Sequence, residues 1–202
     1  SSNTTLTGKS KADSISLSIS TTSKTNSITV VATASATSGI SKYEFSKDGG
    51  KTWVNGGTNK TYTFTGLTAG TSYSIQVRVT ASSGKTSTTS KTVTTSTLTS
   101  PTFKETETSN GKTVTITYPS GCGSSLTCTY QKDNGTAVNV TSTTVNVSFT
   151  ESGSLVATVS DGTNSKSSSY TVTIIPYASD IITELVSTKP DELYTDDNDN
   201  IR

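Results

Sequence analysis

Trp53 is the only tryptophan of the chain, and its ring is of the kind that stacks on the face of a sugar. Tyr43 and Tyr62 lie on either side of it in the sequence. Together the three rings would form a platform for a carbohydrate. The alternative is that Trp53 packs on the core of a β-domain, which is the commoner place for a lone tryptophan. Trp53, Tyr43 and Tyr62 are therefore the candidate ligand-stacking residues, and core packing is the favoured interpretation for Trp53.

Cys122 and Cys128 are the only cysteines, and the residues between them are small and polar, apart from Leu126. A zinc site would need more ligands, because the chain has no histidine and no second cysteine pair. A redox pair would normally be separated by two residues and lie beside a helix. A disulfide that closes a short loop is therefore favoured over two free thiols. It would imply an oxidising, extracellular compartment.

The absence of histidine excludes catalytic triads that use an imidazole base. Two serines precede lysines at the Ser-x-x-Lys spacing, Ser82 with Lys85 and Ser109 with Lys112, but both pairs fall on expected hairpin turns and not on a helix. Three Gly-Lys-Thr triplets lack the earlier glycine of a phosphate-binding loop. We predict that the chain is not an enzyme and that it uses no cofactor.

Charge and hydropathy exclude two classes of partner. The chain has 16 basic and 15 acidic side chains spread along its length and a net charge of +1, so no basic patch for nucleic acid is expected. No apolar segment is long enough to cross a bilayer, so no membrane insertion is expected. Asp196, Asn198 and Asn200 alternate as in a calcium loop, but the required glycine and glutamate are missing. No metal site is predicted.

The spacing of apolar residues predicts the elements that must position these side chains. Only 29% of the residues are hydrophobic and roughly two in five are Ser or Thr, yet the apolar residues recur at alternate positions in short runs. The clearest run is 73–80, where Tyr, Ile and Val alternate with polar residues. Such runs are typical of strands with one buried face. We predict an all-β fold of two tandem Ig-like or fibronectin III-like β-sandwiches, since one sandwich takes about 100 residues.

The pattern divides the chain into four parts. They are a polar N-terminal arm at 1–13, a first sandwich at 14–97, a second sandwich at 102–175, and an acidic tail or linker at 176–202. The pattern lapses between 97 and 102 in a polar joint that Pro101 closes, so motion of one domain relative to the other is the default expectation.

Leu67 and Tyr73 flank the turn Thr68–Thr71 between two alternating runs. This arrangement resembles the corner between the fifth and sixth strands of fibronectin type III domains. The resemblance implies that Leu67 and Tyr73 pin the turn to the core and that the Tyr73 hydroxyl bonds back to the chain.

The second domain resembles the Ig-like modules found in tandem on surface proteins of low-GC Gram-positive bacteria, particularly gut species. The resemblance rests on the runs Tyr118–Cys122, Tyr130–Lys132, Glu151–Ala157 and Val159–Gly162. The tail is similar to the lead-in that precedes further modules in such proteins, which suggests that this chain is a fragment of a longer one.

These observations favour a non-enzymatic extracellular segment, on the cell surface or secreted, that serves as a stalk or adhesive part of a bacterial surface protein. Its partners would be host or surface glycans or proteins, or copies of itself. One alternative is a filament or appendage subunit that assembles by strand exchange, with 1–13 and 176–202 as donor segments. Another is an accessory carbohydrate-binding module that uses Trp53, Tyr43 and Tyr62.

Overall fold

The computed structural model describes residues 13–175. The predicted arm, apart from Asp13, and the predicted tail with its calcium-like spacing at Asp196 lie outside the described residues. Within the described part every helix or strand element is a β-strand, which confirms the all-β prediction. No helix in residues 13–175 has the length and hydropathy needed to span a membrane.

The first sandwich has a three-stranded sheet and a four-stranded sheet, both antiparallel. The order in the smaller sheet is β1-β2-β5 and in the larger sheet β4-β3-β6-β7. The strands are β1 (Ile15–Ser23), β2 (Ile28–Ala36), β3 (Ile40–Ser46), β4 (Val54–Gly57), β5 (Thr61–Phe64), β6 (Ser72–Ala81) and β7 (Thr86–Thr94).

The second sandwich repeats this arrangement, with orders β12-β9-β8 and β11-β10-β13-β14. Its strands are β8 (Thr102–Thr108), β9 (Gly111–Thr117), β10 (Thr127–Lys132), β11 (Val138–Val140), β12 (Thr144–Phe149), β13 (Gly153–Ser160) and β14 (Ser165–Val172). In each sandwich the fourth strand pairs with the third, so β4 corresponds to β11 and every other strand has a counterpart in the same order. The prediction of two tandem β-sandwiches is confirmed.

Alternating side chains from both sheets form one core in each sandwich. The inward positions of β6, which are Ile75, Val77 and Val79, are fully buried, while the residues between them face outward. The second core has its counterparts in Leu155, Ala157 and Val159 of β13. Serine and threonine occupy most outward positions, so a chain of low hydrophobic content still closes two cores.

The corner between β5 and β6 forms as the fibronectin resemblance implies. Leu67 is 1% exposed and belongs to the first core. The backbone N–H of Thr68 donates to the Tyr73 hydroxyl oxygen at 2.9 Å. The predicted bond between Tyr73 and the turn is therefore confirmed.

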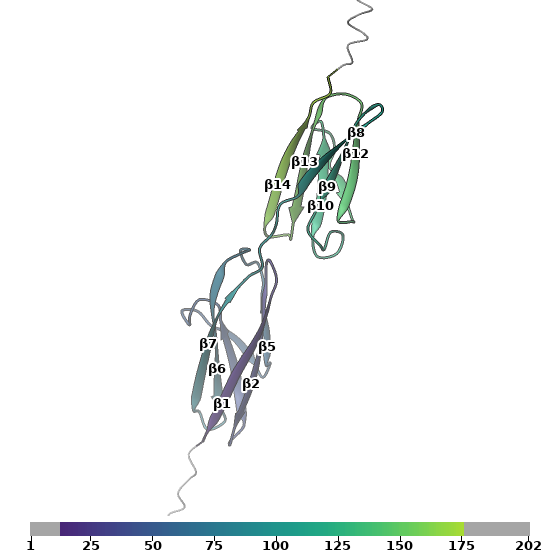
Figure 1. Ribbon diagram of the computed structural model, residues 1–202. Coiled ribbons are helices and arrows are strands. Elements are labelled where there is room, and N and C mark those ends of the chain that lie inside the picture. Colours follow the sequence, from purple (N-terminus) through teal and green to yellow (C-terminus); the bar gives the residue numbers. More distant parts are fainter. Residues whose placement is uncertain (1–12, 176–202) are drawn as a thin grey trace, which may run out of the picture.

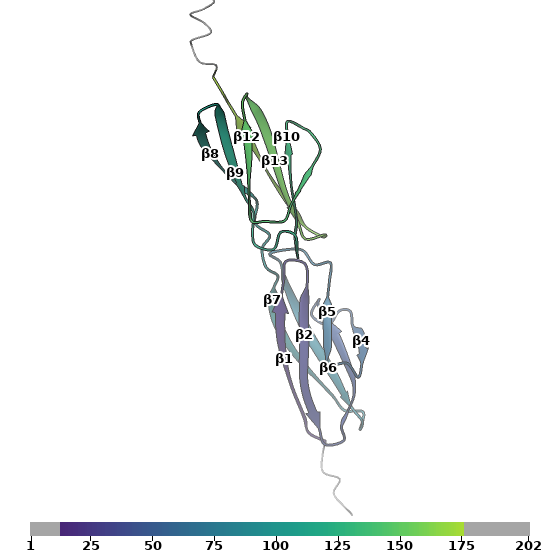
Figure 2. The ribbon, with the colours of Figure 1, turned by 90° about the vertical axis from the view of Figure 1, so that its right-hand side faces the viewer.

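The two sandwiches lie end to end. Figure 1 shows the described chain entering at the purple end of the first sandwich and leaving at the yellow end of the second, at opposite ends of the molecule. The perpendicular view in Figure 2 shows the same arrangement. The turns β1–β2 and β5–β6 of the first sandwich therefore face the turn β13–β14 of the second.

Candidate functional site

The loop between β3 and β4 positions Trp53, and Asp48 organises that loop. The Asp48 carboxylate accepts hydrogen bonds from the Thr52 hydroxyl at 2.6 Å, the Thr52 N–H at 2.9 Å and the Ser46 hydroxyl at 2.8 Å. The Ser46 hydroxyl in turn accepts from the Gly50 N–H at 2.9 Å. The bonds from Thr52 and then Ser46 lower the pKa of Asp48 well below its usual value. The loop is thus held in one shape by its own side chains.

Trp53 lies on the outward face of the four-stranded sheet, against Arg78. The Arg78 guanidinium carbon is 4.4 Å from the ring centroid, a cation–π contact. Arg78 Nε donates to Glu44 Oε2 at 2.9 Å, and Lys42 Nζ is 3.1 Å from Glu44 Oε1. Trp53 is absent from the core cluster, which differs from the expected core packing.

Glu44 is 9% exposed although it faces outward, because the two cations lie over it. The hydrogen bond from Arg78 is the main cause that lowers the pKa of Glu44, and Lys42 adds to it against the opposing effect of burial. Sequence reasoning missed the roles of Glu44 and Arg78. The signal was present, since both occupy outward positions of alternating strands, but the pairing of Glu44 with Arg78 across β3 and β6 is set only by the register.

The predicted platform of three aromatic rings is wrong. Tyr43 is 3% exposed and belongs to the core, on the opposite face of β3 from Glu44. Tyr62 packs against the same core and stacks on Phe45 with 5.5 Å between the ring centroids. Both tyrosines therefore face the interior, while Trp53 lies outside the sheet and has Arg78 over its ring.

Cys122 and Cys128 form a disulfide with their Cα atoms 5.5 Å apart. Both side chains are buried, at 8% and 1% exposure. The Gly121 carbonyl closes the loop by accepting the N–H groups of Ser124, Ser125 and Leu126. The disulfide joins the loop after β9 to the start of β10, beside a hollow of about 430 Å³ that Asp161 and Gly162 also line.

Asp161 and Asn164 belong to the turn between β13 and β14, which meets the first sandwich. The Asn164 side-chain N–H donates to the Leu67 carbonyl at 3.1 Å, and its oxygen accepts the Ala69 N–H at 3.1 Å. The Asn26 side-chain N–H donates to the Asp161 carbonyl at 2.9 Å. We call Asn26, Leu67, Ala69, Asp161 and Asn164 the junction residues. Their three hydrogen bonds fix an orientation, because each requires a particular donor direction.

Asp161 also shapes the turn that carries Asn164. Its Oδ1 accepts the N–H groups of Thr163 at 2.9 Å and Asn164 at 2.7 Å. Burial acts to raise the pKa of Asp161, but hydrogen bonds from Thr25 and from these N–H groups outweigh it, so the pKa lies below its usual value. Thr25 belongs to the first sandwich, so the pKa of this carboxyl depends on residues from both sides of the junction.

Apolar contacts continue across the junction. Leu98, in the link between the sandwiches, is 7% exposed and belongs to the core of the second sandwich. Ala69 of the first sandwich packs against that same core. The expected free motion between the domains is therefore opposed by both buried apolar surface and directional bonds.

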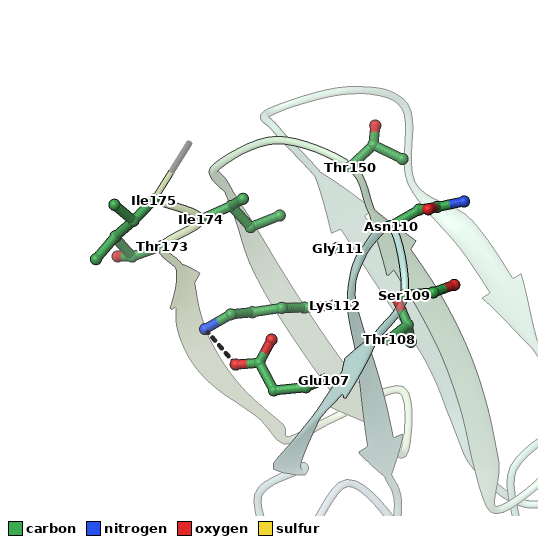
Figure 3. A pocket seen from close by; sticks show the side chains of 10 residues that line it. All are labelled: Glu107, Thr108, Ser109, Asn110, Gly111, Lys112, Thr150, Thr173, Ile174 and Ile175. Carbon is green, nitrogen blue, oxygen red and sulfur yellow. Dashed lines mark ion pairs between the residues drawn. The ribbon is translucent and has the colours of Figure 1, made fainter. Parts of the chain in front are cut away.

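A second hollow, of about 550 Å³, lies at the far end of the second sandwich (Figure 3). Lys112 lines it and pairs with Glu107 at 3.2 Å and with Glu105 at 2.7 Å, and Glu105 also accepts from the Tyr170 hydroxyl at 3.2 Å. The Lys112 ammonium is thus held by carboxylates and makes no hydrogen bond with Ser109. Among residues 13–175 no cluster of three or more His, Cys, Asp or Glu side chains is arranged to hold a metal ion.

No protein-family model matches the chain, and comparison with curated proteins finds no sequence relative. Solved structures of similar fold include the fibronectin(III)-like modules of Clostridium thermocellum CbhA, at 18% identity over 78% of this chain and 94% of that one, with a TM-score of 0.37. A two-domain fibronectin type III segment of chicken tenascin has 15% identity over 79% of this chain and 98% of that one, with a TM-score of 0.34.

The three N-terminal domains of the bacteriophage RB49 Highly Immunogenic Outer Capsid protein have 13% identity over 79% of this chain and 59% of that one, with a TM-score of 0.49. At such identities and TM-scores, these likenesses indicate nothing about the function of this chain. They also give no support to the expected origin in Gram-positive gut bacteria. The fold class rests on the sheets and strand orders of the chain itself.

Proposed function

We propose that this chain is a non-enzymatic extracellular spacer, part of the stalk of a surface protein, that holds its two flanking segments a fixed distance apart. The observation that supports this most is the junction, where Asn164 bonds the main chain of Leu67 and Ala69. A loose pair of domains would need only a flexible link. A junction of directional hydrogen bonds is useful where the separation of the two domains and the angle between them matter.

The positions of the chain ends support the same proposal. The described chain enters and leaves at opposite ends of the pair of sandwiches (Figure 1). A pulling force on the two ends therefore acts along the length of both sandwiches. The buried Leu98 ties the link to the second core. Force along this axis must therefore separate apolar surface and break hydrogen bonds before the link can lengthen.

The disulfide between Cys122 and Cys128 supports the extracellular part of the proposal, because such bonds persist in oxidising compartments. The partners proposed here are the segments on either side of this one. Binding to host or surface glycans or proteins, and to copies of itself, stays a prediction. Strand exchange stays a prediction too, since its expected donor segments lie outside the described residues.

The test measures how far above a surface the chain holds the far end of the first sandwich. The whole chain is attached to a surface through its last residue and carries a fluorophore on a non-natural amino acid at Thr37, an exposed residue at the far end of the first sandwich. The measurement compares the mean height of the fluorophore above the surface, and the spread of that height, between the unaltered chain and a variant. In the double variant Asn26→Ala and Asn164→Ala the mean height should fall and its spread should widen. Equal heights and spreads in the two chains would overturn the spacer proposal.

A further inference from the structure

The common strand order allows the two sandwiches to be compared position by position. Ile28 pairs with Phe64 where β2 meets the end of β5, and Lys112 pairs with Phe149 where β9 meets the end of β12. Counting back from these pairs, the turn 24–27 corresponds to the turn 108–111. Thr25 and Asn26 therefore correspond to Ser109 and Asn110.

This correspondence preserves the chemistry of the junction. The Asn26 amide donates to the Asp161 carbonyl, and the neighbouring Thr25 hydroxyl lowers the pKa of the Asp161 carboxyl. Ser109 and Asn110 place a hydroxyl and an amide at the same positions on the far end of the second sandwich. Figure 3 shows both at the β8–β9 turn beside the hollow, and both are exposed. The second sandwich thus repeats the donor set that the first uses to hold its neighbour.

The segments after the last strands also correspond. Val93 and Val172 are the last buried residues of β7 and β14, so Ser96 corresponds to Ile175. In the first sandwich Ser96 is tied down, because its N–H donates to the Lys24 carbonyl at 3.1 Å and its carbonyl accepts the Gly70 N–H at 3.1 Å. Ile175 is 82% exposed, an unusual position for a large apolar side chain.

The hollow has a clear structural origin. The connection between β5 and β6 runs over residues 65–71, whereas the corresponding connection between β12 and β13 runs only over residues 150–152. In the first sandwich the longer connection lies against both the β1–β2 turn and Ser96, because the Leu67 N–H donates to the Asn26 carbonyl and the Gly70 N–H to the Ser96 carbonyl. The second sandwich has the shorter connection, and its corresponding end has the hollow of about 550 Å³, lined by Asn110, Thr150, Ile174 and Ile175 among others.

We propose that this far end of the second sandwich, formed by Ser109, Asn110, Thr150, Ile174 and Ile175, binds the end of another β-sandwich domain. The turn between the last two strands of that domain offers a main-chain carbonyl to the Asn110 amide, as Asp161 does to Asn26. It enters the hollow and covers Ile175. The contact extends the proposed spacer by one domain and rests on that proposal, but it uses different residues from the existing junction.

The test inserts a second copy of Thr97–Ile175 directly after Ile175, so that every residue of the protein is kept. Because Ser96 corresponds to Ile175, the added link has the same length as the native one. Spin labels on non-natural amino acids at the exposed Ser169 and at its copy leave the disulfide undisturbed. Double electron–electron resonance then gives the distribution of distances between the second sandwich and the added one.

The expected result is one narrow distance peak that is lost in Asn110→Ala. Asn110→Asp is a second variant, which retains a turn-forming side chain and removes the amide donor. Asn139→Ala, an exposed asparagine on β11, is the matched control and should leave the peak unchanged. A broad distribution in the parent chain, or a narrow one that both Asn110 variants retain, would overturn the proposal. Asn26→Ala alters only the first junction and should leave this peak unchanged, so the two proposals can fail separately.

Discussion

Asn164 bonds Leu67 across the boundary between the sandwiches, with its Nδ2 3.1 Å from the Leu67 carbonyl oxygen. Leu67 is itself a core residue of the first sandwich at 1% exposure. The turn that carries it is also fixed by Tyr73. The second sandwich is therefore bonded to a turn that is itself anchored to the core of the first, and little of the junction's rigidity is lost in the turn itself.

Asn164→Ala removes both hydrogen bonds to this turn and should loosen the junction while both sandwiches stay folded. Leaving the Leu67 carbonyl and the Ala69 N–H partly buried without a partner should cost about 1–2 kcal/mol in the free energy of unfolding. Urea denaturation gives this value, and small-angle X-ray scattering should show a wider range of shapes. Asn139→Ala is the control, and a loss of equal size in that variant would contradict the role of the junction.

Acid should weaken the junction through Asp161. The folded structure lowers the pKa of this carboxyl below the value of 3.8 for an unperturbed aspartate, so the folded state binds its proton less readily. The stabilisation is therefore present above that value and is lost as the pH falls through the lower, folded-state pKa. The amide resonances of Thr25 and Asn26, followed by NMR against pH, should shift in this acidic range. In Asp161→Asn that shift should disappear; if it persists unchanged, another group is responsible.

Arg78→Ala should destabilise the first sandwich, because it leaves Glu44 at 9% exposure with only Lys42 as a partner. A double-mutant cycle with Trp53→Ala should give a coupling of about 0.5–1 kcal/mol between Arg78 and Trp53, the usual range for an exposed cation–π pair. Urea denaturation of the four chains provides the energies. A coupling of zero would show that the ring and the guanidinium are neighbours without net attraction.

Gly111→Ala should destabilise the second sandwich by about 2 kcal/mol or more, since a sparsely populated backbone conformation alone costs a side chain about 1–3 kcal/mol. Gly111 has φ of 142°, and a Cβ there would also collide with the backbone oxygen of Phe149. Gly84→Ala is the matched control, because its φ is 85° and a Cβ would meet nothing within 4 Å. Thermal melting should separate the two variants. An equal loss of stability in both variants would show that the collision with Phe149 does not contribute.

Reduction of the disulfide should shift the melting temperature only slightly. The loop from Cys122 to Cys128 has a sequence separation of 6, so the bond removes little chain entropy, and its contribution should be near or below about 2 kcal/mol. The hydrogen bonds to Gly121 should keep the loop in place after reduction. Mass measurement after alkylation of the native protein should detect no free thiol, and two readily alkylated cysteines would refute this prediction.

The strands, the two cores and the corner at Tyr73 could be predicted from the sequence alone, because each follows from interactions close along the chain. Alternation sends Ile75, Val77 and Val79 inward whatever their partners are. The β5–β6 turn is likewise closed by residues near one another in the sequence, because the Thr68 N–H donates to the hydroxyl of Tyr73, and Leu67 is the residue before Thr68.

The contacts that the outward side chains make could not be predicted from the sequence. Trp53 on Arg78, Lys112 between two carboxylates, and Asn164 on Leu67 all depend on strand register or on how two domains meet. The contacts of Trp53 and Asn164 join residues far apart in the sequence, and Lys112 meets Glu105 and Glu107 through the register of the β8–β9 hairpin. Many polar residues in the chain carry the same local signal. Period-2 alternation shows which side chains face outward, but the register and the domain boundary select the partner of each one.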